Sequence, residues 1–101
     1  MENIDYEQNM QYIAKMYKKL KKELEEKSGL HKKSIYIDTN EEYVRYIDTI
    51  LSLMPVEYER IIRNDYLQTR TVKWWQEYYK KSTYYRRKRD AVEAFVDCLS
   101  L

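Results

Sequence analysis

The stretch that decides the fold is WWQEYYKKSTYYRRKRDA, which runs from Trp74 to Ala91. It predicts a short helix, a tight break at Ser82 and Thr83, and a second helix that opens with aromatic residues and four consecutive cations. A helix N-terminus presents free backbone N–H groups and a partial positive charge, and both favour phosphate oxygens. Cations in the first two turns are typical of the recognition helix of a helix-turn-helix protein. The alternative is a charged helix face that is only solvated.

The distribution of charge favours an anionic partner. The whole chain carries a net charge of +2, and residues 1–27 contain six cations and six acids. From Gln68 to Asp90, eight Lys or Arg residues stand against two acids, which gives +6 over 23 residues. A local basic patch on a nearly neutral chain indicates contact with an anionic surface such as nucleic acid.

The sequence as a whole predicts an all-α protein of four to five helices, with a long N-terminal helix followed by a C-terminal helix-turn-helix-like bundle, and composition disfavours a β fold. Glycine and proline occur once each, at Gly29 and Pro55, so tight hairpins are disfavoured. The single cysteine, Cys98, cannot form an internal disulfide, and no long apolar run appears, so we expect a cytoplasmic protein without a membrane segment. Apolar neighbours predict that Cys98 is buried.

Catalytic and metal-binding patterns are missing from the sequence. It has no Gly-rich phosphate loop and no recognisable pairing of a nucleophile with a base, and His31 is its only histidine. Asp38, Asp48 and Asp65 are interpreted as caps or surface charges. We therefore expect a non-enzymatic protein without a cofactor or a metal.

The first 29 residues predict one amphipathic helix, from Asn3 or Asp5 to Lys27, which Gly29 ends. Its apolar residues recur at spacings of 3 and 4 over nearly three heptads: Tyr6, Met10, Ile13, Tyr17, Leu20 and Leu24. We call this set the N-terminal stripe. Such a stripe either packs on the remainder of its own chain or pairs with a second chain, and we predict that it is an oligomerisation element of a dimer.

Residues 39–101 predict the helical domain. Thr39 to Glu42 has the spacing of a capping box, and the helix that follows carries apolar residues on one face: Tyr43, Ile47, Ile50, Leu51 and Met54. Pro55 breaks this helix and starts the next, which contains Ile61, Ile62 and Tyr66. A further short helix is expected through Val72, Trp75 and Tyr79, with Thr69 or Thr71 as its N-cap, and residues 30–38 are expected to form a loop.

The last helix is predicted from Ser82 or Thr83 to Leu99. Its core face is expected to hold Tyr85, Val92, Phe95, Val96 and Leu99. The opposite side is expected to carry Thr83, Arg86, Arg87 and Asp90, flanked by Tyr84 and Arg89. Lys88 should lay its aliphatic stem along the edge of the core.

The residues from Glu41 to Leu99 resemble a known family. The pattern Leu53-x-Pro55, Ile61-Ile62, Trp75 and Lys81-Ser82-Thr83-Tyr84-Tyr85-Arg86 resembles region 4 of sigma factors, and more closely phage late-gene activators of the ArpU/RinA type. Small all-helical mycoplasma proteins carry similar STYYR segments. The sequence departs from the sigma-like pattern at Gln76, where a small residue is usual, and at Lys80-Lys81 in the turn.

The resemblance implies a DNA-binding transcriptional regulator. Thr71 would cap the first helix of the motif, Trp75 and Tyr79 would fill its core side, and Ser82 and Thr83 would cap the recognition helix. We expect phosphate contacts from Lys73, Lys80, Lys81 and the Ser82/Thr83 helix start, and groove contacts from Tyr84, Arg86, Arg87 and Arg89. Double-stranded DNA is the expected partner, and RNA polymerase is a further candidate. The alternative is a tyrosine-rich helical interaction or oligomerisation protein without DNA binding.

Overall fold

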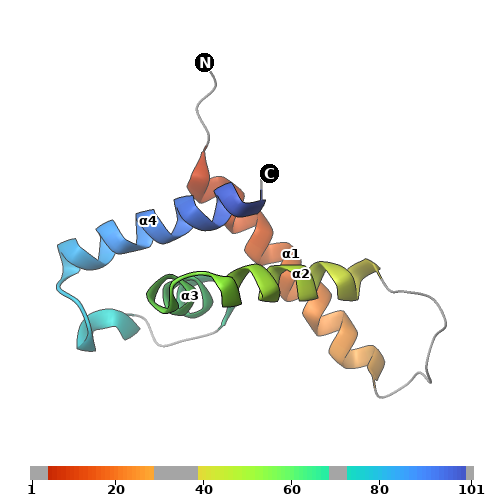
Figure 1. The fold of residues 1–101 in the computed structure, drawn as a ribbon. Coiled ribbons are helices and arrows are strands. Elements are labelled where there is room, and N and C mark those ends of the chain that lie inside the picture. The colour runs from red at the N-terminus through yellow and green to blue at the C-terminus, as the bar shows by residue number, and fades with distance from the viewer. Residues whose placement is uncertain (1–4, 29–38, 69–72, 100–101) are drawn as a thin grey trace.

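A computed structural model describes residues 5–28, 39–68 and 73–99, and this part of the chain is helical without any strand (Figure 1). The elements in order are α1 (Tyr6–Ser28), α2 (Thr39–Leu53), α3 (Val56–Ile62), η1 (Arg63–Leu67), η2 (Trp74–Glu77) and α4 (Lys81–Leu99). The all-α prediction and the long N-terminal helix are confirmed. The loop predicted at 30–38, with His31, and the proposed caps Thr69 and Thr71 lie outside the described residues.

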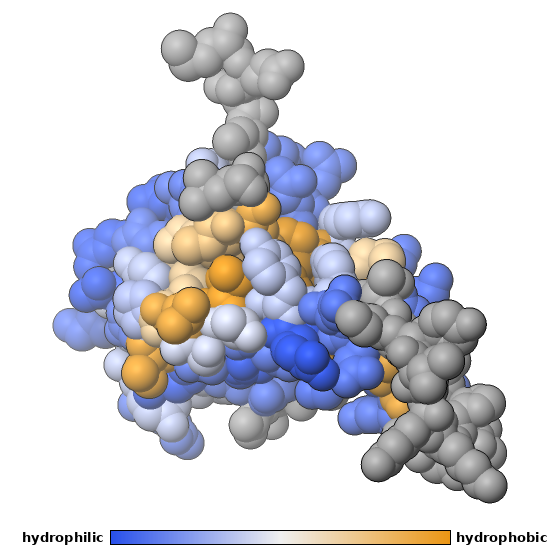
Figure 2. Space-filling model, turned by 45° about the vertical axis from the view of Figure 1, so that its right-hand side comes forward, coloured by the Kyte–Doolittle hydropathy of each residue, from blue (hydrophilic) through white to orange (hydrophobic). Residues whose placement is uncertain are grey.

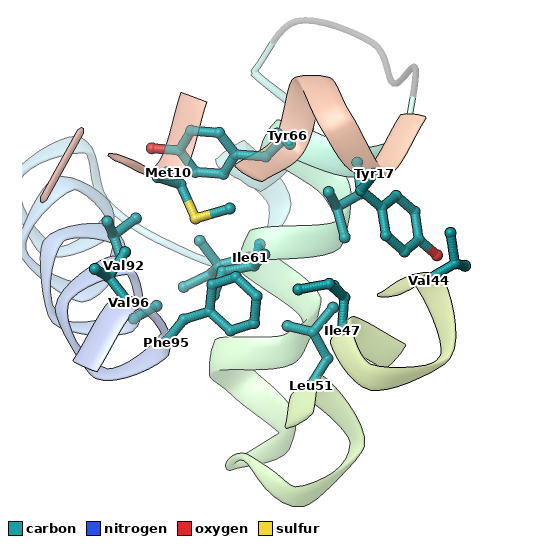
Figure 3. Packing of buried hydrophobic residues seen from close by; sticks show 14 of the residues in the cluster. Met10, Tyr17, Val44, Ile47, Leu51, Ile61, Tyr66, Val92, Phe95 and Val96 are labelled. Atoms are coloured by element: carbon teal, nitrogen blue, oxygen red, sulfur yellow. The ribbon is translucent and has the colours of Figure 1, made fainter. Parts of the chain in front are cut away.

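The helices form one core rather than two separate units. Residues from α1, α2, α3, η1 and α4 belong to a single cluster of buried apolar side chains. Figure 3 shows Met10, Ile61 and Phe95, from three different helices, pointing toward one another, and all three side chains are fully buried. In a chain of this size one such core is the main source of stability.

The N-terminal stripe packs on its own chain. Met10, Tyr17 and Leu20 are buried, and Tyr6, Ile13 and Leu24 pack against the same core from its edge. Ala14, which the stripe omitted, is also buried. The stripe is therefore occupied within one chain, because α2, η1 and α4 offer it an apolar surface that the sequence pattern alone does not display. A dimer stays a prediction, and it would need other side chains as its contact.

Leu20→Ala should lower the free energy of unfolding by about 2–5 kcal/mol, because it leaves a cavity beside the core. Because the stripe packs on its own chain, the urea midpoint of the wild type should not change between low and high micromolar protein concentration, and neither should that of the variant. Midpoints that rise with concentration would contradict this and would place the stripe between chains.

Pro55 separates α2 from α3 as predicted, and it occupies the N-cap position of α3. The helix then continues into a π turn, η1, in which the Gln68 amide donates to the carbonyl of Arg63 at 2.8 Å. Such a wider turn rotates the side chains that follow it relative to an α-helix. In η1, Tyr66 and Leu67 point into the core, and the carboxylate of Asp65 is only 15% exposed.

The helix predicted through Val72, Trp75 and Tyr79 is shorter than expected. The described part is the four-residue 3-10 turn η2, which starts after Lys73 in the left-handed region at φ 64°. A non-glycine residue in that conformation interrupts helical propagation. The rings of Trp74 and Trp75 both contact the Tyr84 ring of α4. The described residues before α4 are therefore held by these tertiary contacts, and they do not form the regular first helix of a helix-turn-helix.

Cys98 is a free, exposed cysteine, so the prediction that it is buried is wrong. The last turn of α4 contacts the core through Val96 and Leu99, and Cys98 lies on the other side of that turn.

None of the described helices is long and apolar enough to cross a membrane.

Candidate nucleic-acid interface

The basic surface is centred on the start of α4, which Figure 1 shows at the edge of the molecule beside η2. The helix begins at Lys81, so Ser82 and Thr83 lie in its first turn instead of capping it. The Tyr84 amide already donates to the carbonyl of Lys80 at 2.8 Å. By the geometry of an α-helix, the three amides before it have no acceptor within the helix and point outward.

Most of the predicted contact residues have exposed side chains. Exposed side chains belong to Lys73, Lys80, Lys81, Ser82, Arg86 and Arg89, and the side chain of Thr83 is half-buried. Among the described residues, none of these five cations forms an ion pair. Their charges are therefore available to a partner.

Tyr84 does not belong to the interface. Its side chain is 1% exposed, it stacks on Trp75 with ring centroids 4.6 Å apart, and it meets Trp74 edge-on at 5.9 Å. Tyr85, predicted to be buried, is 50% exposed. The signal was present in the sequence: Tyr84 precedes Phe95 by eleven residues. That spacing is about three helical turns, so both rings lie on one side.

Asp65 organises the region beneath the interface. Its Oδ1 accepts a hydrogen bond from Trp74 Nε1 at 2.6 Å, its Oδ2 accepts one from the Tyr84 hydroxyl, and Lys88 Nζ lies 3.3 Å from Oδ2. Three donors from two later elements, η2 and α4, thus converge on one carboxylate of η1. The interpretation of Asp65 as a cap or a surface charge is therefore wrong, because its donors are distant along the chain and local spacing does not indicate them.

Arg87 and Lys88 also face inward. Lys88 lies over the Tyr66 ring at 5.1 Å besides its contact with Asp65, as expected for a stem on the core edge. Arg87 was predicted to face outward, but its Nε lies 3.8 Å from Glu57 Oε1 of α3. The outward arginines are therefore Arg86 and Arg89, because the packing of α4 on α3 turns Arg87 toward that helix.

Tyrosine hydroxyls pair with carboxylates throughout the fold. Among the described residues, five such bonds join Tyr6 to Asp97, Tyr17 to Asp48, Tyr66 to Glu7, Tyr79 to Glu57 and Tyr84 to Asp65. Burial and the adjacent carboxylate raise the pKa of Tyr17 and of Tyr66 above the ordinary value. Burial also raises the pKa of Tyr79, where the opposing effects of Arg60 and Glu57 come second. Many tyrosines therefore join elements of the same chain.

The charge pattern of α4 is the reverse of that in the other helices. The first turns of α1, α2 and α3 carry acids, which complement the positive end of the helix dipole. The first turn of α4 has no acid and starts with Lys81, and the acids Asp90, Glu93 and Asp97 come later. Each cation at a positive helix end costs a few tenths of a kcal/mol, up to about 1 kcal/mol. An anion bound there would remove this cost.

No protein-family model matches the sequence, and neither a curated protein nor a solved structure matches it significantly. The similarity to ArpU/RinA-type activators stays a prediction based on the residues quoted above. Within the described part of the chain, no three His, Cys, Asp or Glu side chains are grouped so that they could hold a metal ion.

Proposed function

We propose that this protein is a DNA-binding transcriptional regulator that contacts duplex DNA through the N-terminal half of α4. The observation that carries the proposal is the reversed charge pattern of that helix. Its first turn holds Lys81 and no acid, whereas the other three α-helices place acids at their starts. An arrangement that costs stability in the free protein and is relieved by an anion supports a role in binding.

The mechanism follows from which side chains are exposed. Phosphates would meet the outward amides of the first turn together with Lys80 and Lys81, and this contact sets the position of the helix. Arg86 and Arg89 would then extend to base edges, where an arginine can bind guanine in a bidentate manner. Glu93 and Asp97 follow on the same side of α4 and would repel phosphate, so contact is confined to the first turns.

DNA binding is tested by fluorescence anisotropy with labelled duplexes at a series of salt concentrations. Lys80→Ala combined with Lys81→Ala should weaken binding to all sequences and reduce the slope of log affinity against log salt by roughly two units, because two phosphate contacts are lost. The matched control is Lys18→Ala combined with Lys19→Ala, which removes the same charge from exposed positions on α1. Equal losses in both double variants, or no binding by the wild type at low salt, would overturn the proposal.

One observation favours the alternative of a protein-interaction module. Leu53 and Val56, on either side of the turn between α2 and α3, are 78% and 77% exposed. On the face of the molecule that Figure 2 shows, hydrophobic residues are gathered between hydrophilic ones. Large exposed apolar residues of this kind are typical of contact surfaces. If the wild type does not bind DNA, this corner is the first place to substitute.

A further inference from the structure

Arg87 is held poorly in its inward position. The 3.8 Å between its Nε and Glu57 Oε1 is too long for a hydrogen bond. The Nε atom is buried and has no hydrogen-bond acceptor among the described residues. A buried N–H group without an acceptor costs free energy, because it has lost water and gained no partner. The inward position of Arg87 is therefore only weakly favoured.

Glu57, in contrast, is anchored. Its Oε2 accepts a hydrogen bond from the Tyr79 hydroxyl at 2.8 Å, and the same hydroxyl accepts one from Arg60 Nη2 at 3.2 Å. Arg60 in turn lies over the Tyr78 ring at 4.7 Å. The Glu57 carboxylate is thus held by a hydrogen bond that does not involve Arg87. It is an anchored anion beside a weakly held cation.

We infer that Glu57 occupies the place of a DNA phosphate beside Arg87, and that a real phosphate draws Arg87 outward to join Arg86 and Lys81. This inference rests on the proposed function. The side chain of Arg87 is 44% exposed, so its guanidinium can rotate into solvent while the protein stays folded. A phosphate offers bidentate, charge-assisted hydrogen bonds, whereas Glu57 offers a distant single contact. Glu57 is then a positioning residue that lowers affinity for DNA by competing for Arg87.

Competition by Glu57 for Arg87 should lower the affinity of the protein for DNA. When only a fraction of the molecules has Arg87 free, the apparent dissociation constant rises in inverse proportion to that fraction. Removing the competing charge should therefore tighten binding of a duplex by about 3- to 10-fold at low salt, if roughly a tenth to a third of the molecules have a free Arg87 in the wild type.

The experiment compares five variants by anisotropy with one labelled duplex, and Arg87→Ala alone is the reference for the double variant. Glu57→Gln should tighten binding. Glu57→Asp should tighten it to a smaller extent, since it withdraws the carboxylate without changing the net charge. Glu59→Gln is the matched control, because Glu59 is on the same helix but pairs with Arg63 at 2.9 Å. Placed in an Arg87→Ala background, Glu57→Gln should have no effect, because the competition requires Arg87.

The outcomes separate this inference from the proposed function. If the wild type does not bind DNA, both fail. If it binds, and Glu59→Gln tightens binding as much as Glu57→Gln, the effect is general electrostatics and the inference alone is wrong. The inference is equally wrong if Glu57→Gln still tightens binding in the Arg87→Ala background. Circular dichroism melts confirm folding of each variant, and Glu57→Asp remains informative if Glu57→Gln is destabilised.

Discussion

Asp65→Ala should lower the free energy of unfolding by about 3–5 kcal/mol, because it removes a part-buried carboxylate that three donors share, and each donor left without an acceptor costs about 1–3 kcal/mol. The substitution leaves the Trp74 indole N–H, the Tyr84 hydroxyl and the Lys88 ammonium without their shared acceptor. Domains of this size are stable by only about 5–15 kcal/mol, so the loss is a large share of the total. Urea denaturation followed by circular dichroism measures it, and tryptophan emission should change even in the folded variant.

The control for Asp65→Ala is Glu77→Ala, which removes an acid from the exposed surface of η2 and should change stability by less than about 0.5 kcal/mol. Lys88→Met should cost less than Asp65→Ala, because two hydrogen bonds to the carboxylate remain. The double variant should be less destabilised than the sum of the single changes, since Lys88 is no longer left with an unpaired charge. Additive effects, or an Asp65→Ala variant as stable as wild type, would show that the three donors have other partners.

Stability should fall steeply as pH rises above about 10. In the folded state burial and the Glu7 carboxylate raise the pKa of Tyr66 well above the ordinary value of 10.0, and burial with Asp48 raises that of Tyr17. Above pH 10.0 the unfolded chain therefore loses phenolic protons that the folded chain keeps. Since the folded state binds more protons in this range, stability is complete below the unfolded pKa and decreases with pH up to the folded pKa.

Each tyrosine that stays neutral in the folded state contributes a loss of about 1.4 kcal/mol per pH unit. Tyr66 should contribute close to that amount, and Tyr17 should add to it over its narrower range. Urea denaturation at pH values on both sides of 10.0 measures the slope. Tyr66→Phe should make the slope shallower, whereas Tyr46→Phe, at a 48% exposed ring, should leave it as in the wild type. Equal slopes in the two variants would contradict the assignment to Tyr66.

Local sequence predicted the regular helices well. The spacing of the apolar residues predicted α1, and Pro55 predicted the boundary between α2 and α3. The helix predicted from Ser82 or Thr83 to Leu99 is α4, which starts one or two residues earlier, at Lys81. These features depend on near neighbours: the helical period, a cap, a missing amide proton. The one error on α4 that periodicity should have prevented is the exchange of Tyr84 and Tyr85, because the spacing to Phe95 places Tyr84 on the core side.

The candidate interface was predicted only in part. Exposed cations stand where the charge run indicated, at Lys80, Lys81, Arg86 and Arg89. Arg87 turns toward Glu57 instead, since that pair depends on how α4 lies on α3. Amphipathicity assigns a side chain to a face of its helix, and it does not tell which helix covers that face.

The sequence by itself determined the helical class, the helix boundaries that a cap or a proline marks, and the basic start of α4, because each follows from residues within a turn or two of one another. Only the tertiary structure decided that the N-terminal stripe packs on its own chain, that the segment before α4 is a 3-10 turn, and that Asp65 joins η1, η2 and α4. These features depend on contacts between residues far apart in the chain. Their geometry exists only once the core has brought the helices together, so no local pattern encodes it.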